Sequence, residues 1–239
     1  ISFFVNSGIR FVEETCKMRA FGQMWERLGR ERYGVTDDRA LRFRYGVQVN
    51  SLGLTEAQPE NNVQRIVLEA LGVTLSRNAR TRSLQLPAWN EALGLPRPWD
   101  QQWSLRIQQV LAQETDLLEY DDLFEGSHVM EALTRNLVDE AQAELDDVLS
   151  LGGAFEAIDE LKGRLVRSHT ERMRRIEGGD LPVIGVNCNT STAESPLGGN
   201  ESIMKVDPEV AAETIADVQA WREARNASEV DAALAELER

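Results

Sequence analysis

Several residues of this 239-residue chain that could bind a ligand lie beside short apolar runs. Gln48 lies near the end of the apolar run 41–49, and the loop 50–58 after it is rich in hydroxyl and amide side chains. These groups can donate and accept hydrogen bonds, but the loop holds no nucleophile beside a base. The loop is therefore expected to orient a ligand rather than to attack one.

A set of arginines flanks the same runs and could bind phosphate: Arg42, Arg44, Arg77, Arg80 and Arg82. The guanidinium group stays charged and offers a planar fork of donors to an anion. Composition alone favours the alternative, in which these side chains are solvated or paired with carboxylates. The front half of the chain is nevertheless the better place for an anionic small molecule.

Groups that carry out catalysis or hold metals are scarce. His128 and His169 are isolated, without the spacing to cysteines or carboxylates that a metal site shows. Cys16 and Cys188 form no CxxC motif and are expected to be structural thiols. The glycine pairs lack the spacing of a phosphate-binding loop. The sequence therefore predicts no catalytic residue and no metal ligand.

The net charge of −14 is concentrated in residues 101–239. Nucleic acid needs a basic surface, so this charge argues against a nucleic-acid partner. The absence of an apolar run of about 18 residues argues against a membrane partner, and free thiols without a disulfide framework fit a cytoplasmic location. Because the chain starts at Ile1 rather than at Met, we expect it to be a piece of a longer polypeptide.

The first hundred residues alternate between predicted strands and helices. An apolar run at 1–5, an alternating segment rich in strand formers at 41–49 and a short segment at 83–86 predict strands. Amphipathic patterns at 8–30 and 59–77 predict helices. Such alternation is typical of a parallel sheet or barrel with helical crossovers. We therefore expect an α/β fold that contributes the last strands of a (β/α)8 TIM-type barrel, in which the loops after the strands form the ligand site.

After Trp99 the pattern becomes mostly helical. Helices are predicted at 100–115, 127–150 and 154–177, then a strand at 181–187, a linker at 189–202, and two acidic helices within 207–238 that divide near Asn226. Three domains follow from this pattern: strand–helix units at 1–125, a helical extension with a final strand at 126–188, and a linker with acidic helices at 189–239.

Whole phrases recur in order along the chain, among them ISFF, FVEETCKMRAFGQMW, LRFRYGVQVNSLGLTEAQPENNVQRI, SLQLPAWNEALGLP, EGSHVMEAL and IEGGDLPVIGVN. These phrases resemble the adenosylcobalamin-dependent acyl-CoA mutases, the methylmalonyl-CoA mutase family. The wording TEAQPENNVQRIVLEALGV and SIMKVDPEV is most similar to the ethylmalonyl-CoA mutase subgroup.

The resemblance implies a barrel that admits a CoA thioester along its axis, with a cobalamin-binding domain over the barrel mouth. It implies adenosylcobalamin as the cofactor and the radical rearrangement of ethylmalonyl-CoA to methylsuccinyl-CoA. Family members commonly pair as homodimers. The cobalt-ligating DxHxxG motif does not occur in this chain, and the residues that hold the acyl group are expected upstream of Ile1. The chain alone is therefore expected to be inactive.

The same resemblance implies two sets of binding residues. The acyl-CoA substrate is expected at Ile1, Ser2, Phe4, Arg44, Gln48 and Arg82. The cofactor is expected at Ser51 and Leu52, which align with corrin contacts, at Glu91, which aligns with an acceptor for the adenosyl ribose, and at Ala92, Gly94 and Leu95.

Two departures from the family pattern bear on the substrate. Arg82 stands where many relatives have glutamine, and Pro87 stands where they have asparagine. These changes fit the ethylmalonyl type or another branched acyl group, so methylmalonyl-, isobutyryl- and 2-hydroxyisobutyryl-CoA stay open as substrates. A non-catalytic helical interaction module, binding through 207–238, is the alternative from another class, although it has no need of both the polar loop and Glu91.

Overall fold

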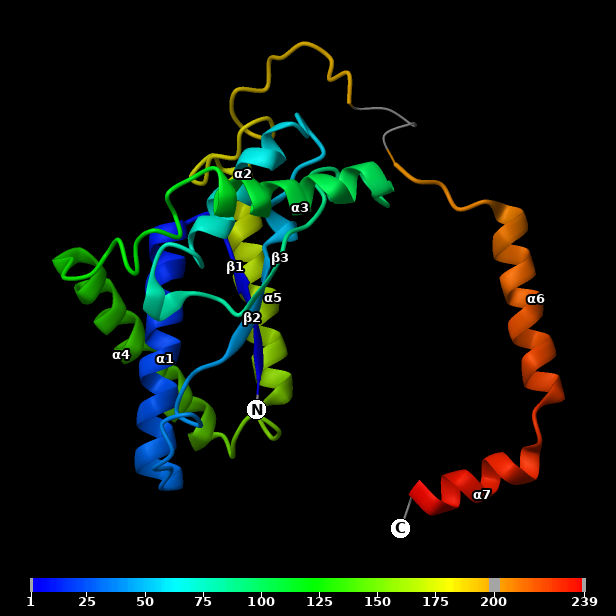
Figure 1. The fold of residues 1–239 in the computed structure, drawn as a ribbon, viewed down its shortest axis with the longest axis horizontal. Coiled ribbons are helices and arrows are strands. Elements are labelled where there is room, and N and C mark those ends of the chain that lie inside the picture. Colours follow the sequence, from blue (N-terminus) through cyan, green and yellow to red (C-terminus); the bar gives the residue numbers. More distant parts are fainter. Residues whose placement is uncertain (1, 198–202, 238–239) are drawn as a thin grey trace. The chain divides into compact units, whose positions relative to one another are not determined.

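The computed structural model describes residues 2–197 and 203–237, which divide into two compact units at Ile203 and Met204. The first unit holds an α/β fold (Figure 1). Its strands are β1 (Phe3–Ser7), β2 (Tyr45–Val49) and β3 (Ser83–Gln85). Its helices are α1 (Phe11–Tyr33), α2 (Asn61–Leu71), α3 (Pro98–Gln113), α4 (His128–Ser150) and α5 (Ile158–Glu177), with 3-10 turns η1 (Ser51–Gly53), η2 (Arg77–Ala79) and η3 (Glu91–Leu93).

The three strands form a parallel sheet in the order β1-β2-β3, which confirms the predicted strand–helix alternation. The register places Asn6 beside Gln48, and Gln48 beside Gln85. Helix α1 connects β1 to β2, and α2 lies between β2 and β3, as parallel pairing requires. All three strands therefore end at one edge, where η1 and η3 follow β2 and β3.

One face of the sheet forms the core. Tyr45, Val47 and Val49 alternate along β2 and are buried, together with Met18 of α1 and Ile66 of α2. Each fully buried apolar side chain of this size stabilises the fold by about 1.5–3 kcal/mol. Because side chains alternate along a strand, the residues between them lie on the opposite face.

That opposite face is open. Phe4 is 63% exposed, and Asn6, Ser83 and Gln85 are exposed as well. Gly46 allows the strands to pack closely there, because a Cβ at this position would lie 2.5 Å from the Ser83 Oγ and 3.0 Å from the Phe4 ring. We call the side of the sheet that carries Phe4, Asn6, Gln48, Ser83 and Gln85 the open face.

Helices α1 and α4 pack side by side in the first unit (Figure 1). Cys16 of α1 is buried against α4, where its sulfur lies 3.8 Å from the Met130 sulfur. Helix α1 ends at Gly34, whose φ of 64° is the left-handed conformation that glycine adopts readily. Helix α4 begins at Ser127, whose Oγ accepts from the Met130 amide.

The predicted strand at 181–187, and with it the final strand of the 126–188 segment, is wrong. This apolar run forms turns, with a single bridge between Ile184 and Cys188. The Asn187 amide nitrogen donates to the carbonyls of Ile176 and Leu181, while its oxygen accepts from the Val183 amide. The side chain therefore replaces strand pairing with local hydrogen bonds.

Two other boundaries differ from the sequence patterns. The strand predicted from residue 41 begins at Tyr45, and the helix predicted to reach Arg77 ends at Leu71. Gly72 follows as the C-cap of the helix. It is closely packed, because a Cβ there would lie 3.2 Å from the Ser7 Oγ. Glycine at a helix end is typical of termination.

The second unit, Met204–Arg239, contains α6 (Pro208–Ala224) and α7 (Ala227–Leu237). Asp207 caps α6 by accepting from the Glu209 amide at 2.9 Å, and Pro208 occupies the first turn. The predicted division near Asn226 is confirmed, because this residue lies between the two helices. Across the described ranges, all helices are too short or too polar to cross a bilayer.

Candidate functional site

The carboxyl edge of the sheet carries two turns that face solvent. In η1, which follows β2, Leu52 is 86% exposed and Ser51 is half-buried. In and after η3, which follows β3, Glu91, Ala92 and Leu95 are exposed, and Gly94 has a φ of 143° that favours glycine. The turns η1 and η3 contact each other, so the structure brings the two predicted cofactor segments together.

Hydrogen bonds to α3 hold the segment before η3 in place. The Trp89 indole is buried and donates to the Asp100 carboxylate at 3.2 Å. Arg97 donates to the same carboxylate through its backbone nitrogen and its guanidinium, each at 2.9 Å. Burial works against ionisation of Asp100, but the hydrogen bonds from Arg97 hold its pKa below the ordinary value. A charged Asp100 therefore anchors this loop.

A buried carboxylate lies beneath η1. Glu69 of α2 is 1% exposed, and a Cβ on Gly53 would lie 3.5 Å from its Oε1. Burial first, and then the negative charge of Glu14, raise the pKa of Glu69 to about 8, although Arg65 acts in the opposite direction. The Oε2 atom of Glu69 has no hydrogen-bond partner in the described chain. Glu69 is therefore neutral over most of the physiological pH range.

The polar loop 50–58 uses much of its polarity internally. The Thr55 hydroxyl donates to the Ala57 carbonyl and accepts from Arg65 at 2.8 Å. Gln58, at the unusual φ of 49°, donates to the Asn189 carbonyl at 2.8 Å. Leu52, Glu56 and Ala57 are the exposed residues of this loop, and Ser51 is half-buried. The loop is polar chiefly because its own backbone needs partners.

The open face carries a row of amide side chains near the same edge. Asn6, Gln48 and Gln85 are paired in register across the three strands. Gln48, on the central strand, is half-buried, and its neighbours are exposed. Phe4 precedes Asn6 by two residues, so it lies on the same face closer to the other end of the sheet. An amide row beside an aromatic ring can orient a polar acyl group without titrating.

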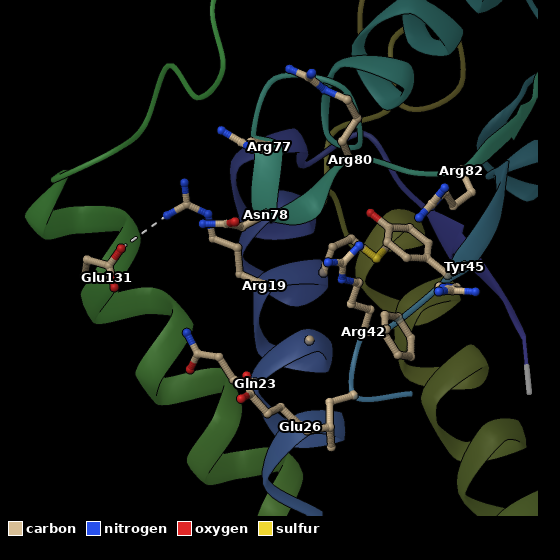
Figure 2. A pocket seen from close by; sticks show the side chains of 15 residues that line it. Arg19, Gln23, Glu26, Arg42, Tyr45, Arg77, Asn78, Arg80, Arg82 and Glu131 are labelled. Carbon is tan, nitrogen blue, oxygen red and sulfur yellow. Dashed lines mark hydrogen bonds and ion pairs between the residues drawn. The ribbon is translucent and has the colours of Figure 1, made fainter. Parts of the chain in front are cut away.

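The amino-terminal end of the strands carries a cavity of about 650 Å³ that is rich in arginine. Figure 2 shows Arg19 entering it from α1, Arg42 from the segment before β2, and Arg82 from the segment before β3. We call this the arginine pocket; its cationic lining residues are Arg19, Arg42, Arg44, Arg77, Arg80 and Arg82. Within the described ranges, the guanidinium groups of Arg42, Arg44 and Arg82 form no hydrogen bond or ion pair, so their charges remain available to an anion.

The remaining arginines hold the pocket wall. Arg19 is buried and donates to the Ser76 hydroxyl at 3.0 Å and to the Asp122 carboxylate at 3.0 Å. Although burial opposes it, the hydrogen bond from Ser76 keeps the pKa of Asp122 below its ordinary value. Arg77 pairs with Asp121 at 2.7 Å, and Arg80 donates to backbone carbonyls. This network joins α1, η2 and the loop before α4.

The predicted substrate residues fall into two places. Phe4 and Gln48 lie on the open face, whereas Arg44 and Arg82 line the arginine pocket; Ser2 is exposed just before β1, and Ile1 lies outside the described residues. Sequence reasoning did not select Asn6, Gln85, Glu69 or Asp100. Register with Gln48 could have identified the first two, but a buried carboxylate leaves no distinct signal in a helical pattern.

The residues present fit the cofactor that the resemblance implies. Leu52 and Leu95 expose apolar side chains at the carboxyl edge, which suits the rim of a corrin ring. The Glu91 carboxylate is exposed and forms no hydrogen bond within the described chain, so it can accept from sugar hydroxyls. Ala92 is small and exposed, and Gly94 lies against the Ile203 side chain, because a Cβ there would lie 3.2 Å from the Ile203 Cδ1.

The first unit is thus an α/β unit whose parallel sheet has solvent-exposed turns at its carboxyl edge and arginines at its amino-terminal end. The family model described as methylmalonyl-CoA mutase matches residues 1–239. The chain belongs to the methylmalonyl-CoA mutase family.

The chain can also be compared with individual relatives of this family. The chain is 60% identical to the ethylmalonyl-CoA mutase of Cereibacter sphaeroides and 56% identical to that of Methylorubrum extorquens, in each case over 100% of this chain. It covers 37% and 35% of those two proteins. The methylmalonyl-CoA mutase of Cereibacter sphaeroides is 30% identical over 100% of this chain, which covers 33% of that protein. The chain thus spans about a third of the length of the curated relatives it matches.

Proposed function

We propose that the chain is part of an adenosylcobalamin-dependent mutase that converts ethylmalonyl-CoA to methylsuccinyl-CoA. The main support is a difference in sequence identity to two enzymes of Cereibacter sphaeroides. The chain is 60% identical to its ethylmalonyl-CoA mutase and 30% identical to its methylmalonyl-CoA mutase. Family membership also favours an enzyme over the helical interaction module. The three parallel strands would be the last strands of a (β/α)8 barrel, with the open face toward its lumen.

The predicted substrate residues support the proposal that different parts of the acyl-CoA bind at different positions along the strands. Arg44 and Arg82 would attract the anionic part of the CoA thioester at the amino-terminal end, helped by Arg42. Gln48 would orient the thioester or carboxylate oxygen near the carboxyl end. Phe4 and Ser2 would line the path between these groups, Ser2 through its hydroxyl. Such positioning of the reacting group is the main contribution a protein makes in cofactor enzymes.

The cofactor residues lie at the carboxyl edge. Ser51 and Leu52 would contact the corrin, Glu91 would accept from the ribose of the adenosyl group, and Ala92, Gly94 and Leu95 would pack beneath it. When bound, adenosylcobalamin supplies the radical chemistry. The part of this chain is to bind, to orient and to exclude water from the reacting centre. A cobalamin-binding domain or subunit, and a second copy in a homodimer, are the proposed partners.

The test uses the whole natural protein with adenosylcobalamin and separate CoA thioesters. We expect conversion of ethylmalonyl-CoA to methylsuccinyl-CoA, read by mass spectrometry, at a kcat/KM about tenfold or more above that for methylmalonyl-, isobutyryl- or 2-hydroxyisobutyryl-CoA, a modest ratio for an acyl pocket that discriminates by methylenes. Reactions without the cofactor serve as the blank. Preference for another of these thioesters would refute the substrate assignment, and no turnover of any would refute the mutase assignment.

A further inference from the structure

One buried amide joins the two loops that carry the predicted cofactor residues. Asn62, in the first turn of α2, is 0% exposed. Its nitrogen donates to the Thr55 carbonyl at 2.8 Å and to the Trp89 carbonyl at 2.9 Å. Thr55 lies two residues after η1, and Trp89 lies two residues before η3. The side chain therefore connects the loop after β2 to the loop after β3.

The same side chain has no hydrogen-bonding capacity to spare. Its oxygen accepts from the Thr55 amide at 3.0 Å and from the Arg65 guanidinium at 2.7 Å. A carboxamide offers two donors and two acceptor lone pairs, and here all four are used. Arg65 continues the connection, because it also donates to the Thr55 hydroxyl at 2.8 Å and to the Ile184 carbonyl at 2.9 Å. Burial lowers the pKa of Arg65, which forms no ion pair among the described residues.

We infer that Asn62 is a positioning residue that sets the spacing of η1 and η3 and thereby the seat of the cofactor. Asn62 is too deeply buried to touch a ligand, so it acts only through the two loops. Hydrophobic packing alone leaves a surface loop several conformations, whereas directional hydrogen bonds to a rigid helix select one. The claim that Asn62 sets the seat of the cofactor rests on the proposed function. The claim that Asn62 joins the two loops rests on geometry alone.

The test compares cofactor-free whole natural protein with the Asn62→Leu variant by hydrogen exchange. We expect amide exchange in 50–57 and 86–93 to accelerate together by about tenfold or more, because each loop loses at least one hydrogen bond with the Asn62 side chain. Binding of cobalamin is expected to weaken by about tenfold, with binding of an acyl-CoA changed by less than about threefold.

Ser76→Ala is the matched control, because it removes a buried hydroxyl that bonds Arg19 and Asp122 at the opposite end of the sheet. It should leave exchange in 50–57 and 86–93 at the wild-type rate. Asn62→Asp is the milder second variant. It keeps the acceptor for the Thr55 amide and Arg65 but can donate to neither the Thr55 nor the Trp89 carbonyl. The loop 86–93 loses its only hydrogen bond from this side chain, whereas 50–57 keeps one, so exchange should accelerate more in 86–93 than in 50–57.

The outcomes separate the two claims. Wild-type exchange in both loops of the leucine and aspartate variants would overturn the positioning role, as would equal acceleration in Ser76→Ala. Accelerated exchange with unchanged cobalamin affinity would overturn the cofactor part of the inference. If the wild-type protein binds no cobalamin, the proposed function and the cofactor part fall together, while the exchange rates still decide whether Asn62 joins the loops.

Discussion

At the amino-terminal end of the sheet, Arg42, Arg44 and Arg82 have guanidinium groups that form no hydrogen bond or ion pair in the described chain. At the carboxyl end, the buried Arg65 and Asp100 are engaged in hydrogen bonds that hold loops. The amino-terminal end thus has guanidinium groups available to an anion, whereas at the carboxyl end the charged side chains hold the loop backbone.

The two ends of the sheet would suit two kinds of ligand. Free arginines suit a flexible anionic group, because electrostatic attraction tolerates variation in position. Fixed loops with exposed Leu52 and Leu95 suit a rigid ligand that must be held in one orientation. The comparison predicts that mutations at the amino-terminal end chiefly change ionic attraction, whereas mutations at the carboxyl end chiefly change loop order. Arg19 is the exception, because it is buried.

The largest effect is expected for Arg19→Met, which tests that exception. The variant leaves Asp122 buried without its charge partner, so the free energy of opening η2 should fall by about 3–5 kcal/mol. Native-state hydrogen exchange across 74–82 measures it. Arg30→Met, which removes exposed pairs with Glu26 and Asp38, is the control and should cost less than about 1 kcal/mol. Equal losses in both variants would contradict the role of the buried pair.

A pH effect of intermediate size is expected from Glu69 at the carboxyl end. Its pKa is raised to about 8 in the folded protein, so the folded state binds the proton more tightly than the unfolded state. The stabilisation is complete below the unfolded pKa near 4.5 and is lost as the pH rises through about 8. In that window the free energy of opening should fall by up to about 1.4 kcal/mol per pH unit.

Glu69→Gln removes the titration while keeping the shape of the side chain. Hydrogen exchange of α2 and η1 between pH 5 and 8, corrected for intrinsic rates, should show a flatter pH dependence in this variant than in the wild type. The same slope in both proteins would show that Glu69 is not the buried titrating group.

A smaller effect is expected for Gln48→Leu on the open face. Loss of one oriented amide should weaken acyl-CoA binding by about tenfold, which corresponds to about 1.4 kcal/mol. Isothermal titration of the whole natural protein measures the affinity. Gln64→Leu, on the exposed surface of α2, is the control and should bind as the wild type does. A Gln48 variant with unchanged affinity would remove this residue from the substrate site.

The smallest effect is expected for Arg82→Gln in the arginine pocket. An exposed cation contributes about 0.5–1 kcal/mol, so acyl-CoA affinity should fall by about two- to fivefold. The loss should shrink in high salt, because exposed charges are screened. Arg77→Gln is the control, since Arg77 lines the same pocket but is already paired with Asp121. A larger loss for Arg77 than for Arg82 would contradict the distinction between free and paired arginines.

Much of the fold could be predicted from hydrophobic patterns. The strands β1 and β3 and the helices α1, α3 and α4 lie where apolar spacing places them, because each buries a regular face. The run 181–187 is equally apolar but folds into turns, since the Asn187 side chain supplies its hydrogen bonds locally. A strand also needs a neighbour, and periodicity does not show which neighbour is available.

The site could be predicted less well. Phrase resemblance selected exposed residues such as Glu91 and Leu52, whose roles stay predictions. It did not select Asn62 or Arg19, because their importance lies in contacts with residues 27 and 103 positions away in the chain. A sequence read on its own does not show such long-range partners.

A crystal structure of the whole natural protein with cobalamin and an acyl-CoA bound tests the central claim most directly. We predict the corrin against Leu52 and Gly94 at the carboxyl edge, and the CoA phosphates beside Arg44 and Arg82 at the other end, with the acyl chain passing Gln48 along the open face. Cobalamin bound at the arginine pocket, or an acyl-CoA that avoids the open face, would contradict the account.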